Sequence, residues 1–131
     1  MVVDSSALLA ILFDEFETEK FVETIDRDVA PKLSVVSQVE TTMVYLGRRA
    51  NADSNTVSNL VAALGLQLQG IDTAQAATAI EAFKRYGKGR HPARLNLGDC
   101  FSYALAAKLG EPLLFKGEDF ARTDIAAAWR P

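Results

Sequence analysis

The sequence predicts a single α/β domain in which a central, mostly parallel sheet lies between two layers of helices. Two observations support this fold class. Short apolar runs typical of buried strands alternate with longer segments of helical periodicity. The chain has 131 residues, of which 49% are hydrophobic and 24% charged, and this suits one folded domain spanning residues 1–131.

The expected elements follow from the spacing of the apolar residues and from the residues that start and stop helices. In chain order, the expected strands are residues 2–4, 32–36, 66–71, 112–115 and a short segment within 125–129. The expected helices are residues 5–13, 17–27, 37–49, 55–64, 73–86 and 99–109. Ser5 or Ser6 is the expected cap of the first helix. Ser37 and Glu40 have the spacing of a capping box, and Gly110 is a typical helix stop.

An aspartate stands at three similar joints of this predicted fold. Asp4 ends the first strand, Asp99 opens an apolar helix, and Asp119 follows the strand at 112–115. In open α/β sheets, ligands bind at the carboxyl ends of the strands. Three acids gathered at that edge would favour the binding of a divalent cation. Mg²⁺ and Mn²⁺ prefer carboxylate and water oxygens, and they activate water for phosphodiester hydrolysis.

Each acid also has a structural interpretation. Asp4 and Asp99 are suited to capping a helix, and Glu40 to completing a capping box with Ser37. Asp119 resembles an ordinary loop acid, as do its neighbours Glu118 and Asp124. No competing catalytic motif is present: the sequence has one histidine and no phosphate-binding glycine loop, nucleophile elbow or zinc-binding helix motif.

The charges are unevenly distributed along the chain. The net charge is −3, and seven of the 17 acids lie between residues 14 and 28. Five of the 14 basic residues lie in the short segment 84–94. This basic segment could steer a polyanion to one side of the domain, or it could simply be a solvated loop.

The remaining composition limits the class of protein. A single cysteine, Cys100, excludes an internal disulfide and a multi-cysteine metal site. No apolar run approaches the roughly 18 residues of a membrane span, and the N-terminus does not resemble a secretory signal. We therefore expect a cytoplasmic protein without a membrane partner.

Four segments carry further information when they are taken together in order: Val3–Leu8, Glu40 in an early helix, Leu97–Ala104 and Leu113–Phe120. This series resembles PIN-domain ribonucleases, specifically the VapC-like toxins of bacterial type II toxin–antitoxin systems. The likeness extends from the first residue to about Ile125. It implies a three-layer α/β/α PIN-like domain with a central mostly parallel sheet.

The resemblance also implies an activity, namely metal-dependent hydrolysis of RNA by an endoribonuclease with water as the nucleophile. Asp4, Glu40, Asp99 and Asp119 match the four acids that bind Mg²⁺ or Mn²⁺ in this family, and we expect them to be the catalytic residues. Ser6 matches a hydroxyl position beside that site. The residues expected to contact substrate are Ser6, Arg85, Lys88, Arg90 and Lys116.

The resemblance further implies two protein partners. One is a cognate VapB-like antitoxin that lays a segment across the acidic groove; the other is a second copy of the chain. The residues expected in the homodimer interface are Met43, Val44, Leu46, Val57 and Leu60. Two alternatives remain: a PIN-like domain that binds RNA or protein without cleavage, and a phosphatase with Asp4 as nucleophile. The phosphatase normally needs a second acid two residues later, where this chain has Ser6.

Overall fold

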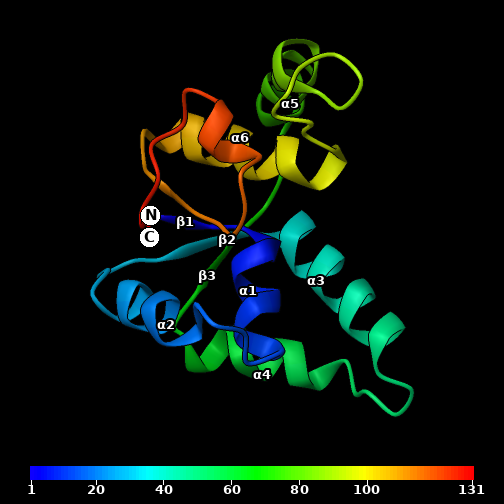
Figure 1. The fold of residues 1–131 in the computed structure, drawn as a ribbon, viewed down its shortest axis with the longest axis vertical. Helices are drawn as coiled ribbons and strands as arrows, with labels where there is room; N and C mark the ends of the chain where they lie inside the picture. Colours follow the sequence, from blue (N-terminus) through cyan, green and yellow to red (C-terminus); the bar gives the residue numbers. More distant parts are fainter.

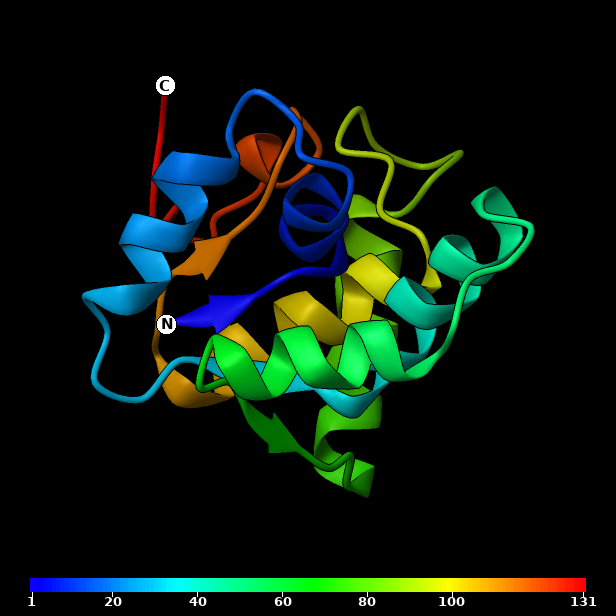
Figure 2. The ribbon, with the colours of Figure 1, turned by 90° about the horizontal axis from the view of Figure 1, so that it is seen from below.

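The computed structural model describes residues 1–131 and contains one sheet of four parallel strands, in the order β3-β2-β1-β4 (Figures 1 and 2). The strands are β1 (Val2–Val3), β2 (Lys32–Ser34), β3 (Gln67–Gln69) and β4 (Leu113–Leu114). The helices are α1 (Ser5–Leu12), α2 (Thr18–Asp26), α3 (Val35–Arg48), α4 (Asn55–Ala63), α5 (Thr73–Tyr86), α6 (Leu97–Leu109) and the 3₁₀ helix η1 (Phe120–Arg122). None of these helices is both long and apolar enough to cross a membrane.

The two faces of the sheet are covered by different helices. Successive residues of a strand point to opposite faces. Val2 and Leu113 therefore belong to a core with α5 and α6, whereas Val3 and Leu114 belong to a core with α1, α2 and α4. The predicted three-layer α/β/α architecture is confirmed, and Figure 1 shows α5 and α6 on one side of the strands and α1, α2 and α4 on the other.

The carboxyl ends of the strands meet at one edge of the sheet, on the right-hand side of Figure 1. β1 passes directly into α1 through Asp4, and β2 passes directly into α3. Contacts between α3 and α6 close this edge. The fold therefore brings the starts of α1, α3 and α6 together at the place where the sequence predicts a site.

The starts of two helices differ from the prediction because the last residues of the strands act as caps. Asp4, not Ser5 or Ser6, caps α1: its Oδ2 accepts a hydrogen bond of 3.0 Å from the backbone N–H of Ser6. Ser34 caps α3 by accepting a bond of 3.2 Å from the N–H of Val36. Ser37 consequently lies inside α3, and the capping box predicted for it is wrong.

The start of α6 also differs from the prediction, because a capping box forms at this end of the helix. Asn96 and Asp99 form this box, with Oδ1 of Asn96 2.9 Å from the N–H of Asp99 and Oδ2 of Asp99 3.0 Å from the N–H of Asn96. Asp99 is therefore the third residue of the helix and not its first. The end of α6 is as predicted, with Gly110 in the left-handed conformation (φ 63°).

The two outer sides of the sheet, at β3 and beside β4, differ from the prediction. Leu68 in β3 is 45% exposed, and β3 lies at the edge of the sheet. No strand forms within residues 125–129; a single bridge joins Ala127 to Leu113. The alternating pattern of residues 66–71 thus predicted the strand but not its burial.

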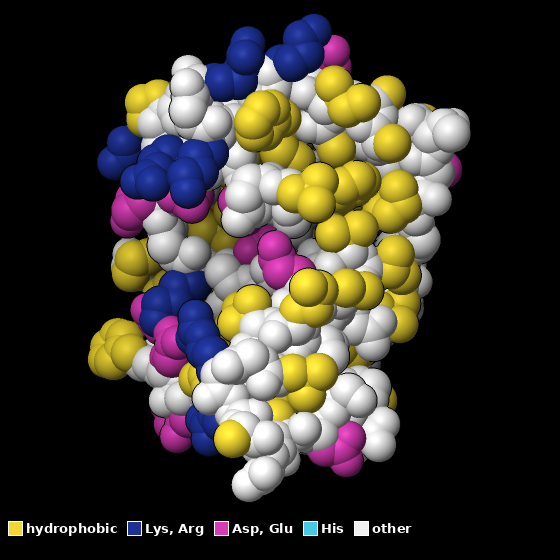
Figure 3. Space-filling view, turned by 90° about the vertical axis from the view of Figure 1, so that its right-hand side faces the viewer, with side chains coloured by type: hydrophobic (Ala, Val, Ile, Leu, Met, Phe, Trp, Pro, Cys, Tyr) yellow, Lys and Arg dark blue, Asp and Glu magenta, His cyan; other side chains and the backbone are white.

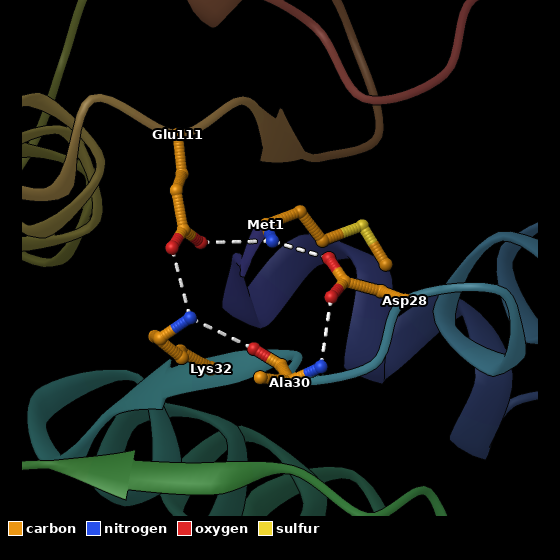
Figure 4. Close-up of polar contacts among 5 residues, drawn as sticks. All are labelled: Met1, Asp28, Ala30, Lys32 and Glu111. Atoms are coloured by element: carbon orange, nitrogen blue, oxygen red, sulfur yellow. Dashed lines mark hydrogen bonds and ion pairs between the residues drawn. The ribbon is translucent and has the colours of Figure 1, made fainter.

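An ionic cluster lies at the amino ends of the strands, opposite the carboxyl edge of the sheet (Figure 4). The α-amino group of Met1 pairs with the carboxylates of Asp28 and Glu111, the latter at 2.8 Å, and Lys32 pairs with Glu111 at 2.8 Å. Hydrogen bonds from Lys32 and the amino group lower the pKa of Glu111. Burial raises the pKa of Asp28, but the bonds from the amino group and from the N–H of Ala30 outweigh it, so that this pKa is also lowered. This cluster joins β1, β2 and the α6–β4 connection.

Candidate active site

Four acidic residues from distant parts of the chain lie at the carboxyl edge of the sheet. Asp4 ends β1, Glu40 lies in α3, Asp99 lies in the first turn of α6, and Asp119 follows β4 at the start of η1. The structure brings them into electrostatic range of one another, because Asp4, Glu40 and Asp119 all raise the pKa of Asp99. Figure 3 views the molecule from this edge and shows acidic side chains in a hollow, hydrophobic side chains above and below, and Lys and Arg along one side.

Asp4 is the most buried of the four, with only 1% of its surface exposed. Its Oδ2 accepts hydrogen bonds from the N–H of Ser6 at 3.0 Å and from the Ser6 hydroxyl at 2.6 Å. Its Oδ1 accepts a bond of 2.6 Å from the hydroxyl of Ser102 in α6. The Ser6 oxygen in turn accepts from the backbone N–H of Lys116 at 3.0 Å, which links Asp4 to the end of β4.

Glu40 reaches across from α3 to the starts of α1 and α6. Its Oε1 accepts a hydrogen bond from the hydroxyl of Ser5, and its carboxylate lies against Gly98. Burial raises the pKa of Glu40, the Ser5 hydroxyl opposes this effect, and the charge of Asp4 adds to it. Glu40 therefore points into the site and not along its own helix.

Asp99 is the most strongly perturbed acid of the site. Burial is the largest cause of its raised pKa, and the negative charge of Asp4 raises the pKa further. The hydrogen bond from the N–H of Asn96 lowers the pKa, whereas repulsion from Glu40 and Asp119 raises it. Together these effects raise the pKa of Asp99 to about 7. A carboxylate with this environment is stabilised by any nearby positive charge.

Asp119 occupies the N-terminal position of η1, is exposed, and caps no backbone N–H with its side chain. Its neighbour Glu118 is exposed as well. Asp124, in contrast, accepts a hydrogen bond of 2.6 Å from the hydroxyl of Tyr103 and pairs with Arg85 at 3.3 Å. Among these three acids, Asp119 is the one whose charge acts on Asp99.

The donor chemistry of the site fits a hard divalent cation, since all four side chains are carboxylates and they repel one another. No group of three or more acidic, histidine or cysteine side chains converges closely enough to hold an ion in this arrangement. Asp4, Glu40 and Asp99 are each bonded to protein donors. An ionised carboxylate has about four lone-pair sites, so an oxygen that accepts one of these bonds can still ligate a cation.

The residues predicted to contact substrate have different surroundings. The ammonium of Lys116 pairs with Glu15 and with Glu17, the latter at 3.0 Å, so only its backbone N–H takes part in the site. Arg85 lies over the ring of Tyr86, 4.7 Å from its centre, and pairs with Asp124. The side-chain Nε of Arg90 donates a hydrogen bond of 3.2 Å to the carbonyl of Lys84.

Two other basic residues, in the connection between α5 and α6, are more accessible to a substrate. Lys88 and Arg94 are exposed, and neither forms an ion pair. Arg94 adopts a left-handed backbone conformation (φ 56°), which places it at a sharp turn of the connection between α5 and α6. In Figures 1 and 2 this connection and α3 project from the same right-hand side of the molecule as the carboxyl edge of the sheet.

The surface beside the acids is apolar. A groove of about 610 Å³ runs along α3 and the start of α6, and its most exposed apolar residues are Val39 (58%), Met43 (68%) and Leu97 (74%). Of the residues predicted for a homodimer interface, Val57 is 1% exposed, and Leu60 is half-buried and packs against the core formed with α1, α2 and α4. The prediction is wrong for Val57, because this residue of α4 faces the sheet.

The hydroxyl and backbone N–H groups that hold the carboxylates were not among the predicted site residues. These are Ser5, Asn96 and Ser102. The bond between Asn96 and Asp99 could have been predicted from the sequence, because Asn96 precedes Asp99 by three residues, as in a capping box. Ser102 follows Asp99 by three residues and therefore lies on the same face of α6.

Comparison with known proteins shows relatives along the whole chain. The model of the PIN domain family matches residues 1–126. Ribonuclease VapC30 of Mycobacterium tuberculosis is 43% identical over 131 residues, which is 100% of both chains. A ribonuclease VapC of Mycolicibacterium smegmatis is 45% identical over 127 residues, covering 97% of this chain and 98% of the relative.

Solved structures share the fold at much lower identity. The crystal structure of Mycobacterium tuberculosis VapC20, a sarcin–ricin loop cleaving toxin, has a TM-score of 0.78 and 16% identity, with 99% of this chain and 98% of that chain covered. A toxin–antitoxin complex from Klebsiella pneumoniae has a TM-score of 0.72 and 15% identity at the same coverage. At these identities the likeness shows the arrangement of helices and strands.

Proposed function

Because the chain belongs to the PIN domain family and is related to VapC ribonucleases over its full length, we propose that it is an endoribonuclease toxin that hydrolyses RNA with Mg²⁺ or Mn²⁺. The observation that carries this proposal is the gathering of four acids at one edge of the sheet, where burial first, and then the charges of the other three acids, raise the pKa of Asp99 to about 7. Gathering like charges destabilises the folded chain, whereas a bound divalent cation turns the repulsion into attraction.

In this proposal the carboxylates of Asp4, Glu40, Asp99 and Asp119 hold the cation. When bound, such a cation supplies an activated water and a positive charge beside the reacting phosphate. The chain's own contribution is orientation. The Ser6 hydroxyl fixes Asp4, the Ser5 hydroxyl fixes Glu40, and the backbone N–H of Asn96 fixes Asp99.

RNA is the proposed substrate because the basic residues lie on the same side of the molecule as the acids. Lys88 and Arg94, together with Arg85 and Arg90, would neutralise backbone phosphates while the acids and their cation face the scissile bond. The names of the relatives support this substrate class, since both VapC30 and the Mycolicibacterium smegmatis protein are ribonucleases.

We propose that a VapB-like antitoxin neutralises the protein by covering the apolar groove beside the acids. The exposed side chains of Val39, Met43 and Leu97 suit a helix that presents apolar residues at positions i, i+3 or i+4, and i+7. An arginine on that helix would face Glu40 and Asp99, because a carboxylate pair attracts a guanidinium. The Klebsiella toxin–antitoxin complex supports a partner of this kind.

For the homodimer, only Met43, Val44 and Leu46 of the predicted residues remain outside the core. Light scattering of the isolated protein, with Leu46→Glu as a comparison, tests this assembly. We expect a dimer that Leu46→Glu weakens. A monomeric mass for the unmodified protein at micromolar concentration would contradict it.

The decisive experiment is incubation of the purified protein, free of antitoxin, with total cellular RNA. We expect discrete cuts with Mg²⁺ or Mn²⁺, none with chelator, and none with Asp4→Asn. Asp119→Asn is compared with Glu118→Gln, which removes a neighbouring exposed charge and should retain activity. Complete absence of cleavage by the folded protein, with RNA binding retained, would favour the alternative of a non-catalytic RNA-binding domain.

A further inference from the structure

The carboxylate of Asp4 is held from two directions by hydroxyl groups. Ser6, two residues along the chain, bonds to Oδ2, whereas Ser102 approaches Oδ1 from α6 at 2.6 Å. Ser102 is separated from Asp4 by 98 residues of sequence and is completely buried. The contact therefore depends on the tertiary packing of α6 against β1.

A second buried hydroxyl supports Ser102. The oxygens of Ser37 in α3 and Ser102 are 3.1 Å apart, and both residues are 0% exposed. A hydroxyl has a single proton to donate. Because Ser102 gives its proton to Asp4, Ser37 must donate to Ser102, and the two hydroxyls form a chain of donors that ends on the carboxylate. Such chains polarise one another in a low-dielectric interior.

This arrangement is unusual for serine and threonine in helices, whose hydroxyls commonly bond to a carbonyl of the preceding turn. Thr41 in α3 follows the common pattern and donates to the carbonyl of Ser37 at 2.7 Å. Ser102 instead donates across the interface to Asp4. An alanine at position 102 would lack only the hydroxyl oxygen and would bury no polar side-chain group, so packing alone does not account for the hydroxyl.

The hydroxyl does account for the orientation of the carboxylate. The last torsion of an aspartate side chain has only a broad, two-fold preference, so its carboxylate plane is fixed by contacts and not by rotamer energy. Ser6 alone bonds to one oxygen; Ser102 bonds to the other. With both in place, rotation of the Asp4 carboxylate is restricted.

We infer that Ser102, supported by Ser37, is a positioning residue that orients Asp4 for cation binding. This inference rests on the proposed function, because it assigns to Ser102 an effect on a ligand of the metal. Groups that orient metal ligands in this way typically change metal affinity or activity about 10- to 100-fold when they are removed.

The test is Mn²⁺ binding to the metal-free full chain, measured by titration calorimetry for the unmodified protein, Ser102→Ala, Ser37→Ala and Thr41→Val. We expect Ser102→Ala to weaken Mn²⁺ binding about tenfold or more and to raise the Mn²⁺ concentration for half-maximal RNA cleavage by the same factor. Ser37→Ala should weaken binding less, in the same direction. Thr41→Val removes a buried hydroxyl of α3 that donates to a backbone carbonyl and to no carboxylate, and it should leave Mn²⁺ affinity unchanged.

The outcomes separate the two proposals. If the unmodified protein binds no Mn²⁺ and cleaves no RNA, the proposed function fails. If the unmodified protein binds and cleaves but Ser102→Ala binds Mn²⁺ as tightly, only the role of Ser102 is overturned. Should Ser102→Ala fail to fold, Ser37→Ala decides, because it leaves Ser102 in place; unchanged affinity in that variant would overturn the inference.

Discussion

The carboxylate of Glu40 lies against the backbone of Gly98, in the space that a Cβ atom at position 98 would occupy. An ideal Cβ on Gly98 would stand 2.6 Å from Oε1 of Glu40 and closer still to the rest of the carboxylate. Gly98 does not have a positive φ, so this glycine provides space and not backbone freedom. It allows an acid from α3 to reach the first turn of α6, beside Asp99.

We therefore expect Gly98→Ala to reduce metal-dependent RNA cleavage about tenfold or more while leaving the fold intact. The displaced group is the end of a flexible side chain, so Glu40 moves and the helix does not. Alanine also favours a helix over glycine by about 1 kcal/mol, and the thermal midpoint should stay the same or rise.

Gly47→Ala is the matched control for this substitution. Gly47 also lies in a helix, α3, and a Cβ there meets nothing within 4 Å. This variant should gain stability and keep full activity. Full activity of Gly98→Ala would show that the position of Glu40 against Gly98 is irrelevant to cleavage.

The raised pKa of Asp99 predicts how stability changes with pH in the absence of metal. Its folded pKa of about 7 exceeds the ordinary value of 3.8, so the unfolded chain releases this proton at lower pH. Asp99 thus costs stability progressively as the pH rises from about 4 to about 7. Asp99→Asn keeps the shape without the charge, and in chelator at pH 8 it should be more stable by on the order of 1–2 kcal/mol, with the advantage vanishing near pH 4.

Thermal unfolding from pH 4 to pH 8 checks this prediction. Asp26→Asn removes one charge from an exposed position of α2 that has no ion pair, and its effect should not grow with pH. Mn²⁺ should reverse the order at pH 8, because a cation that binds only the folded chain stabilises the unmodified protein and not Asp99→Asn. An Asp99→Asn variant that is less stable at every pH would indicate that Asp99 acts only as part of the capping box.

The position of Asp4, Asp99 and Asp119 at one edge of the sheet was predictable from the sequence, because each lies near the end of a strand or the start of a helix. Asp4 interrupts an apolar run, Asp99 lies in the first turn of an apolar helix, and Asp119 follows a strand. Parallel strands then bring these joints to one edge of the sheet. The layers of the fold followed from the same alternation of strands and helices.

The helix starts and the partners of the acids were less predictable, for a physical reason. β2 passes into α3 without a loop, so Ser34 serves as the last strand residue and as the cap, and the apparent cap at Ser37 is displaced into the helix. Ser102 bonds to Asp4 across 98 residues, and local periodicity holds no information on such pairs. The exposure of Leu68 likewise depends on its place in an edge strand.

The ionic cluster around the amino terminus should stabilise the fold without affecting the site, because it lies at the opposite edge of the sheet. Glu111→Gln removes the carboxylate shared by Met1 and Lys32, and it should cost about 1 kcal/mol at pH 7 with RNA cleavage unchanged. The folded pKa of Glu111 is lowered, so its stabilisation is present at neutral pH and lost as the pH falls below about 4.

Urea unfolding at pH 7 and at pH 3 measures this difference. Glu81→Gln breaks an exposed pair with Lys84 on α5 and should have almost no effect. Equal stability of Glu111→Gln and the unmodified protein at pH 7 would mean that the cluster contributes nothing.

The basic connection between α5 and α6 should determine how RNA binding depends on salt. We expect the combined change of Arg85, Lys88 and Arg90 to glutamine to weaken RNA binding. With fewer phosphate contacts, fewer counterions are released from the RNA when the protein binds. For a single-stranded RNA, the slope of log affinity against log salt should become shallower by about 0.7 for each contact that is lost. Binding is measured in the Asp4→Asn background, which prevents cleavage. As the control, Lys20→Gln combined with Arg27→Gln removes two charges from α2, in the other helical layer, and should leave the slope unchanged. If the slope is also unchanged in the Arg85, Lys88 and Arg90 variant, the connection between α5 and α6 does not hold RNA.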